Sequence, residues 1–216
     1  RYPSVAVTGM TGVGKTRLAD RLARRVSDAG TVDVGSAVME RRTRSSARGR
    51  GFRFRVVPGD NAATRLAALD EVFYEEPVDG IVHVVSYGHA TPRRAGGTSG
   101  AAPSRTRDEQ LAAELEDWTI TAHRIAAMAV RRAKPMWVVI AVTKADLYPN
   151  DIDAAVDYYS PGSGSPFAAK LDELRSLAGG ATISIDVLPV SAENSKELDS
   201  LLATLEARMA QLSGHV

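Results

Sequence analysis

Eight residues near the amino terminus have the types and the spacing that phosphate binding requires. Residues 9–16 read G-M-T-G-V-G-K-T, and they lie between a strand-like apolar run and a helical pattern. Backbone N–H groups of such a loop can turn inward to phosphate oxygens where no Cβ intervenes, and the following helix adds a partial positive charge. A chance glycine-rich turn is the alternative, and the flanking strand and helix argue against it.

Each position of this loop has an expected role. Gly12 and Gly14 are the positions where a side chain would be tolerated least. The Lys15 ammonium is expected to contact the β- and γ-phosphates of a nucleotide, and the Thr16 hydroxyl to coordinate Mg²⁺. The residues predicted to bind the phosphates are Gly12, Val13, Gly14, Lys15, Thr16 and Arg17.

Two further motifs follow apolar runs in the second half of the chain. Residues 138–142 lead into T-K-A-D at 143–146, and residues 188–190 lead into S-A-E at 191–193. With the glycine-rich loop before them, these motifs make the sequence resemble the Ras-like, translation-factor-related class of P-loop GTPases. In that class the guanine-recognition motif is N/T-K-x-D and the fifth motif is S-A-K/E. The resemblance covers most of the chain and implies a guanine rather than an adenine nucleotide.

The resemblance assigns roles within these two motifs. The Asp146 carboxylate would accept hydrogen bonds from the guanine N1–H and N2–H₂ groups, a pair that adenine does not offer. The stem of Lys144 would lie over the base, and the Ala192 amide would donate to the guanine O6. Asp146 could instead cap a turn before Pro149. The predicted base-binding residues are Thr143, where the family more often has Asn, Lys144, Asp146, Ser191, Ala192 and Glu193.

The third motif departs from the family pattern. The family has D-x-x-G, in which the Asp holds Mg²⁺ through water and the Gly amide meets the γ-phosphate, but residues 56–59 read V-V-P-G. This looks like the bacterial polarity-type Ras-like GTPases, whose third motif ends in V-P-G-Q. Asp60 stands where Ras-like enzymes carry the Gln that orients the attacking water, although it could also approach Mg²⁺ or cap the next helix. The predicted catalytic residues are Lys15, Gly59 and Asp60.

A second Mg²⁺ ligand is expected in the segment between residues 30 and 43. Thr31, Ser36 and Thr43 all carry a suitable hydroxyl, and Ser36 has the spacing that the family analogy favours. Thr16 and Ser36 are therefore the predicted metal ligands. One of the arginines in this region could reach the phosphates as a finger in cis, and the candidates are Arg41, Arg42 and Arg44.

The elements that must position these motifs alternate between strand-like runs and helical patterns, which favours a mainly parallel sheet covered by helices. We expect a single domain over residues 1–216, a three-layer α/β P-loop fold. It would have six strands, one of them antiparallel at an edge, and about five helices. Residues 38–41 and 52–57 are predicted to form a hairpin, and residues 63–74 a helix. Residues 87–107 are predicted to be a flexible insertion, and a polar loop is expected after Tyr148.

Composition narrows the class of protein further. With 44% apolar residues, 25% charged residues and a net charge of +1 over 216 residues, the chain is neither disordered nor uniformly basic. The absence of cysteine excludes disulfides and thiol chemistry and fits a reducing compartment. The longest apolar run, residues 136–142, is far shorter than the roughly 20 residues that span a bilayer, so we expect a cytoplasmic protein. The four histidines lack zinc-site spacing.

Positive charge is concentrated in one segment. Seven arginines fall between Arg41 and Arg55 with no acidic residue among them. This basic hairpin is either a solvated surface or a docking face for an acidic protein partner, with nucleic acid less favoured.

Taken together, the motifs predict a small GTPase domain that binds GTP and GDP with Mg²⁺ and hydrolyses GTP slowly as a molecular switch. An effector or activating protein is expected at the switch regions and the basic hairpin, and a homodimer is also conceivable. The alternative is a hydrolysis-deficient nucleotide-sensing domain of a larger bacterial protein or defence complex, which the departures in the third motif favour. An ATP-using P-loop enzyme is a third class, and the motif ending in Asp146 argues against it.

Overall fold

A computed structural model describes residues 2–23, 40–45, 51–59, 62–91, 106–132, 134–179 and 181–214. Its strands are β1 (Ser4–Thr8), β2 (Glu40–Ser45), β3 (Gly51–Val56), β4 (Gly80–Val85), β5 (Met136–Val142) and β6 (Ile183–Pro189). They form one sheet in the order β2-β3-β1-β4-β5-β6. The pairs from β3 through β6 are parallel, and β2 runs antiparallel beside β3. The predicted α/β class is confirmed.

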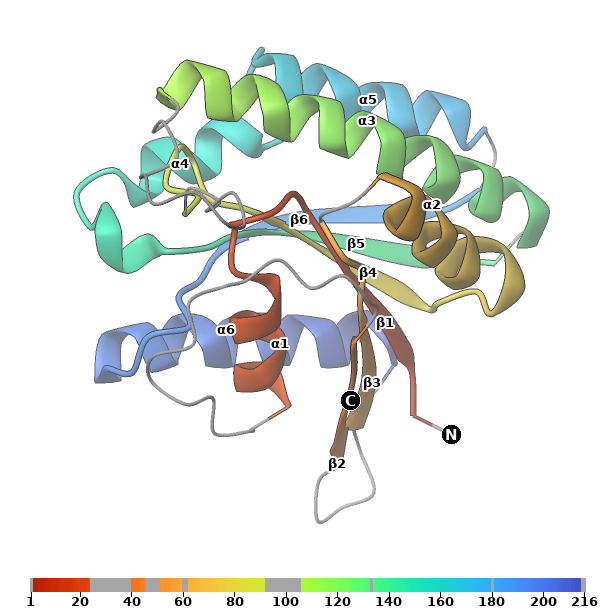
Figure 1. The fold of residues 1–216 in the computed structure, drawn as a ribbon, viewed down its shortest axis with the longest axis horizontal. Coiled ribbons are helices and arrows are strands. Elements are labelled where there is room, and N and C mark those ends of the chain that lie inside the picture. Colours follow the sequence, from red (N-terminus) through yellow and green to blue (C-terminus); the bar gives the residue numbers. More distant parts are fainter. Residues whose placement is uncertain are drawn as a thin grey trace.

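The helices are α1 (Lys15–Leu22), α2 (Ala62–Asp70), α3 (Arg107–Arg132), α4 (Ile152–Tyr159), α5 (Pro166–Leu177) and α6 (Lys196–Leu212). A π-helical turn, η1 (Glu71–Glu75), continues α2, and a 3₁₀ turn, η2 (Ala145–Leu147), follows β5. Helices α2, α3, α4 and α5 lie on one face of the sheet, whereas α1 and α6 lie on the other (Figure 1). The molecule therefore has three layers.

The central strands are apolar on both faces because helices cover both. Every residue of β4 and β5 is buried. Along β5, Val138 and Ile140 pack with the larger helical layer, whereas Val139 and Ala141 pack with α1 and α6. This alternation is the period of two expected for a strand, and burial on both sides explains the unbroken apolar sequence.

The parallel strands place the four phosphate and base motifs at one edge of the sheet. The register aligns Val7 with Val56, Val85 with Val142, and Val142 with Pro189. The segments that follow β1, β3, β5 and β6 therefore emerge at the same carboxyl edge, where ligands bind in open α/β sheets.

The sequence predicts a loop after Tyr148 and about five helices, and the first prediction was wrong. The structure has α4 in this interval, so that six α-helices lie within the described residues. Helix α4 buries Ala155 and Tyr159, four residues apart on one side. The short amphipathic pattern was obscured by the Pro, Gly and Ser residues on either side of it. The helix predicted over residues 63–74 is α2 followed by the π-helical turn.

The hairpin has a partly different arrangement from the predicted one. Its first strand continues to Ser45 instead of ending at Arg41, with Arg41 paired to Arg55 and Ser45 to Gly51. Phe54 packs under α1 as the alternation predicts. Arg55 is only 6% exposed, and it donates to the carbonyl and, at 3.5 Å, to the carboxylate of Glu76. Arg55 is therefore covered by the turn after η1 and cannot contribute to a solvated docking face.

Candidate functional site

The glycine-rich loop joins β1 to α1 in a left-handed conformation that its glycines permit. Gly12 and Gly14 have φ angles of 86° and 95°, a region that residues with a Cβ rarely occupy. Gly14 caps α1, and its carbonyl accepts the first intrahelical bond from Leu18 at 3.0 Å. A Cβ on Gly14 would point toward the Lys144 stem, 3.8 Å away. The positive φ at Gly14 therefore disfavours a side chain, and the loop lies beside the Lys144 stem of the base motif.

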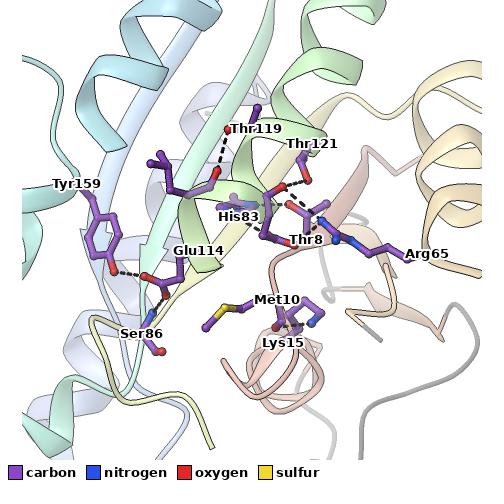
Figure 2. Close-up of polar contacts among 12 residues, drawn as sticks. Thr8, Met10, Lys15, Arg65, His83, Ser86, Glu114, Thr119, Thr121 and Tyr159 are labelled. Atoms are coloured by element: carbon purple, nitrogen blue, oxygen red, sulfur yellow. Dashed lines mark hydrogen bonds and ion pairs between the residues drawn. The ribbon is translucent and has the colours of Figure 1, made fainter. Parts of the chain in front are cut away.

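The two reactive positions of the loop begin helix α1. Lys15 is buried, and its ammonium donates to the Met10 carbonyl at 2.9 Å, as Figure 2 shows. Thr16 is half-buried and Arg17 is exposed. Lys15 therefore lies inside the loop rather than in solvent.

The guanine-motif residues meet the fifth motif directly. The Ser191 hydroxyl donates to Asp146 Oδ1 at 2.6 Å and accepts from the Glu193 amide at 3.1 Å. The Ala145 amide donates to the Val190 carbonyl at 3.2 Å. Asp146 is thus held in one orientation by a residue 45 positions away, and its second oxygen is left for another donor.

Lys144 links the base motif to the phosphate loop. It adopts a left-handed conformation with φ of 60°. Its ammonium donates to the Gly12 carbonyl at 2.9 Å, the His89 carbonyl at 2.9 Å and the Thr91 hydroxyl at 3.0 Å. The Thr91 amide also donates to the Gly12 carbonyl at 2.9 Å. We call residues 86–91 the strap. The strap contacts the phosphate loop at Gly12 and the base motif at Lys144.

The remaining predicted residues also converge on this edge. Arg17 of α1 forms an exposed ion pair with Glu193 at 2.6 Å, which connects the phosphate loop to the fifth motif. Thr143 is buried, and its amide donates to the Val85 carbonyl at 2.8 Å. Ala192 lies between Ser191 and Glu193 and is half-buried. The residues of the predicted phosphate and base motifs thus contact one another at this edge.

Gly59 of the third motif lies against the phosphate loop. A Cβ on Gly59 would come within 2.6 Å of the Thr11 amide nitrogen and 2.7 Å of the Lys15 ammonium. Only glycine fits there, because both neighbours belong to the loop itself. Val56 and Val57, which precede it, are buried apolar residues. Asp60 and Ser36 lie outside the described residues, as do Thr31 and residues 92–105 of the predicted insertion, and the side chains of 40–45 are not described.

Sequence reasoning missed a set of buried polar residues beside this site. Glu114 and Asp117 fall on the same face of α3 as Trp118 and Ile125, and all four are buried. Two acids within an apolar stripe were a signal that could have found them, because buried carboxylates require partners. His83 of β4 belongs to the same set, and the sequence suggests no more than a strand residue there.

Glu114 anchors the strap. Its carboxylate accepts from the Ser86 amide at 2.8 Å and from the Tyr159 hydroxyl (Figure 2). Burial raises the pKa of Glu114 to about 7, even though both hydrogen bonds favour the charged form. The strap is further held by the Gln110 side chain, which accepts from the Ala90 amide at 2.9 Å.

Comparisons with known proteins place this geometry in a class of folds. No protein-family model and no curated protein matches the chain. Among solved structures, that of the mammalian SRP receptor matches with a TM-score of 0.60 at 17% identity, covering 97% of this chain and 99% of that chain. A complex of the signal recognition particle receptor SRb with GTP and SRX, from Chaetomium thermophilum, matches with a TM-score of 0.61 at 12% identity, covering 95% and 98%.

A third match is the NFeoB protein of S. thermophilus bound to GDP and AlF₄⁻, with a TM-score of 0.52 at 14% identity, covering 97% of this chain and 64% of that chain. Identities this low establish the fold alone. The chain therefore has the fold of GTP-binding P-loop domains, as the resemblance of its motifs implies.

Among the described residues, no three His, Asp or Glu side chains gather in a way that could hold a metal ion. No helix in the same part of the chain has both the length and the apolar character to cross a membrane.

Proposed function

We propose that this chain is a guanine-nucleotide switch domain that binds GTP and GDP and hydrolyses GTP slowly. The proposal rests on the hydrogen bond from the Lys144 ammonium to the Gly12 carbonyl. This bond joins the phosphate loop to the base motif that contains Asp146. Asp146, oriented by Ser191, supplies the acceptor for guanine, and the glycine-rich loop with Lys15 supplies the phosphate cradle. Both halves of a nucleoside triphosphate site are thus present and connected.

Residues that would hold Mg²⁺ are proposed on the chemistry of the donors. The Thr16 hydroxyl is a hard oxygen donor at the start of α1, beside Lys15, and such oxygens suit Mg²⁺. Ser36 is the proposed second protein ligand. When bound, the ion neutralises charge on the β- and γ-phosphate oxygens.

In the proposed reaction, water attacks the γ-phosphorus in line with the bond to the β–γ bridging oxygen, which breaks to give GDP and phosphate. Lys15 offsets the charge on the phosphates, and the Gly59 amide is proposed to donate to the γ-phosphate. Asp60 is proposed to orient the water. The chain has no carboxylate at the Mg²⁺-supporting position of the third motif, so its intrinsic hydrolysis is proposed to be slow. A protein partner that binds the segments around Ser36 and Gly59 would raise the rate.

A hydrolysis-deficient nucleotide-sensing domain is the second candidate. It is favoured by Val56, whose buried apolar side chain stands in the third motif where the family carboxylate would be. The two candidates share the binding site and differ only in the chemical step.

Single-turnover assays with GTP and with ATP, combined with binding of each nucleotide and Mg²⁺ titration, test the proposal. Guanine-selective binding with slow cleavage supports the switch. Selective binding with no cleavage supports the sensing domain, and preferential ATP binding rejects both.

A further inference from the structure

Helix α3 carries a carboxylate at the centre of the molecule that the proposed chemistry does not use. Asp117 is 5% exposed. Its Oδ1 accepts from the Arg65 guanidinium, and its Oδ2 lies 3.6 Å from His83 Nε2. Removing a carboxylate from water is costly unless a charged partner compensates, so this arrangement requires an explanation.

The charged partner comes from the segment that follows Gly59. Arg65 lies in α2, which begins three residues after Gly59, and its side chain is 16% exposed. The same guanidinium nitrogen also lies 3.3 Å from the Asp117 carbonyl. Figure 2 shows Arg65 reaching from α2 toward Thr8 and His83. One end of α2 is thus fixed to α3 through both the side chain and the main chain of Asp117.

On the side away from Arg65, Asp117 is connected to the phosphate loop through His83 and Thr8. Thr8 Oγ1 and His83 Nδ1 are 2.8 Å apart, and Thr8 immediately precedes the loop. Burial, together with the charges of Arg65 and Lys15, lowers the pKa of His83 to about 3, so its ring is neutral. Burial raises the pKa of Asp117, and the positive charges of Arg65 and Lys15 oppose that rise. The carboxylate therefore lies in the fields of two cations, one from α2 and one from the phosphate loop.

We propose that Arg65 and Asp117 form a positioning pair that holds the start of α2 so that Gly59 stays against the phosphate loop, and that this pair makes the site prefer GTP over GDP. The inference rests on the proposed function. Gly59 lies close to the phosphate loop, since a Cβ built on it would come within 2.6 Å of the Thr11 amide nitrogen and 2.7 Å of the Lys15 ammonium. Only GTP offers a γ-phosphate to the Gly59 amide. A displaced Gly59 would therefore weaken the binding of GTP and leave the binding of GDP unchanged.

The test compares GTP-analogue and GDP affinities of Arg65→Gln with those of the unaltered chain. We expect analogue affinity to fall about 10-fold, as for a lost charge-assisted hydrogen bond, with GDP affinity within about 2-fold. Single-turnover hydrolysis should slow by about 10- to 100-fold, since small misplacements carry such penalties. Arg65→Lys, which keeps the charge, should restore part of the analogue affinity.

Two further variants separate positioning from stability. Arg124→Gln is the matched control, because Arg124 of α3 pairs with Asp70 of α2 at 3.1 Å in the same interhelical contact, farther along the chain from Gly59. It should leave the ratio of GTP-analogue to GDP affinity unchanged. Arg65→Gln with Asp117→Asn should melt higher than Arg65→Gln alone, because no buried charge is left without its partner, and should show the same ratio as Arg65→Gln.

The outcomes separate a failure of the positioning pair from a failure of the proposed function. If the unaltered chain prefers GTP but Arg65→Gln lowers both affinities equally, or neither, the positioning pair is refuted while the switch proposal stands. If Arg65→Gln does not fold, the double variant and Arg65→Lys decide the ratio in its place. If the unaltered chain binds no guanine nucleotide, the proposed function fails and the inference falls with it.

Discussion

At the scale of single residues, base selection is assigned to Asp146. Its Oδ1 is occupied by Ser191, which fixes the plane of the carboxylate without neutralising it. A carboxylate held in this way can accept from two donors on the edge of guanine, whereas an amide would present one donor in place of an acceptor.

Asp146→Asn is therefore expected to weaken GTP and GDP binding by about 10- to 100-fold, as for the loss of charge-assisted hydrogen bonds, and to leave any weak ATP binding unchanged. Fluorescent-nucleotide titrations would measure this. Ser191→Ala serves as the comparison, because it keeps the carboxylate and removes only its orientation, and its effect should be smaller. Equal losses for GTP and ATP would contradict the assignment of Asp146 to the base.

The buried ionisable residues predict opposing effects of pH on stability. Glu114 has a folded pKa of about 7, above its ordinary value of 4.5, so between these pH values the folded state retains a proton that the unfolded chain has lost. Its contribution to the free energy of unfolding therefore falls as pH rises through that window. His83 has a folded pKa of about 3, below 6.5, so its contribution rises with pH between 3 and 6.5.

Replacing Glu114 by Gln isolates the first effect. Between pH 4.5 and pH 7.5, the free energy of unfolding of Glu114→Gln should rise by roughly 3 kcal/mol relative to that of the unaltered chain. Urea titrations at several pH values would measure it. Glu116→Gln, an exposed position on the same helix, controls for the loss of a charge on α3. A difference that does not vary with pH would show that Glu114 ionises in the fold as it does in the unfolded chain.

At the scale of elements, the strap connects parts that are distant in sequence. Its backbone is held by Glu114, Gln110 and Tyr159, and its Thr91 meets both Gly12 and Lys144. The hydroxyl of Thr91 accepts from the Lys144 ammonium beside the Gly12 and His89 carbonyls, so its removal weakens that junction without abolishing it.

Thr91→Val is accordingly expected to speed nucleotide dissociation a few-fold, because one hydrogen bond to a charged group is lost while those to the Gly12 and His89 carbonyls remain. Stopped-flow release of a labelled nucleotide would measure the rate. Thr204→Val, the same exchange at an exposed position of α6, is the control. An unchanged rate would mean that the strap supports the fold without affecting the bound nucleotide.

Element boundaries also show which patterns the sequence reveals. Strand β5 coincides with the apolar run at residues 136–142, because an unbroken run bounded by Pro135 and Thr143 has one simple interpretation. Helix α4 was missed because eight residues give little periodic signal between loops. Arg55 was interpreted as solvated, and its burial depends on Glu76, 21 residues away, which no local pattern indicates.

At the scale of the whole molecule, the site lies where two separately packed layers meet. One apolar cluster contains residues of α2, α3, α4 and α5, and the other contains residues of α1 and α6, with the sheet between them. The phosphate loop enters α1 on one face, while Arg65 and Asp117 lie on the other. A ligand at the shared carboxyl edge of the strands is thus expected to stabilise both layers together.

Guanine nucleotide should therefore raise the melting temperature of the domain. At a ligand concentration of about 100 times Kd, binding to the folded state alone adds about 2.7 kcal/mol to the free energy of unfolding. Differential scanning fluorimetry with GDP, GTP and ATP would show the shift. ATP should cause little change, and Asp146→Asn should remove the guanine-specific part. Equal shifts with all three nucleotides would contradict guanine selectivity.

The sequence by itself determined the α/β class, the order of the motifs and their places at the ends of strands, because each of these depends on residues adjacent in the chain. The phosphate loop and the base motif were recognisable for that reason, and the residues predicted within them converge on one edge. Only the tertiary structure decided that Thr8 meets His83, 75 residues away, and that Arg65 meets Asp117, 52 residues away. Such pairs depend on how helices dock across a sheet, and the energy that selects them comes from burial, which has no signature in local spacing.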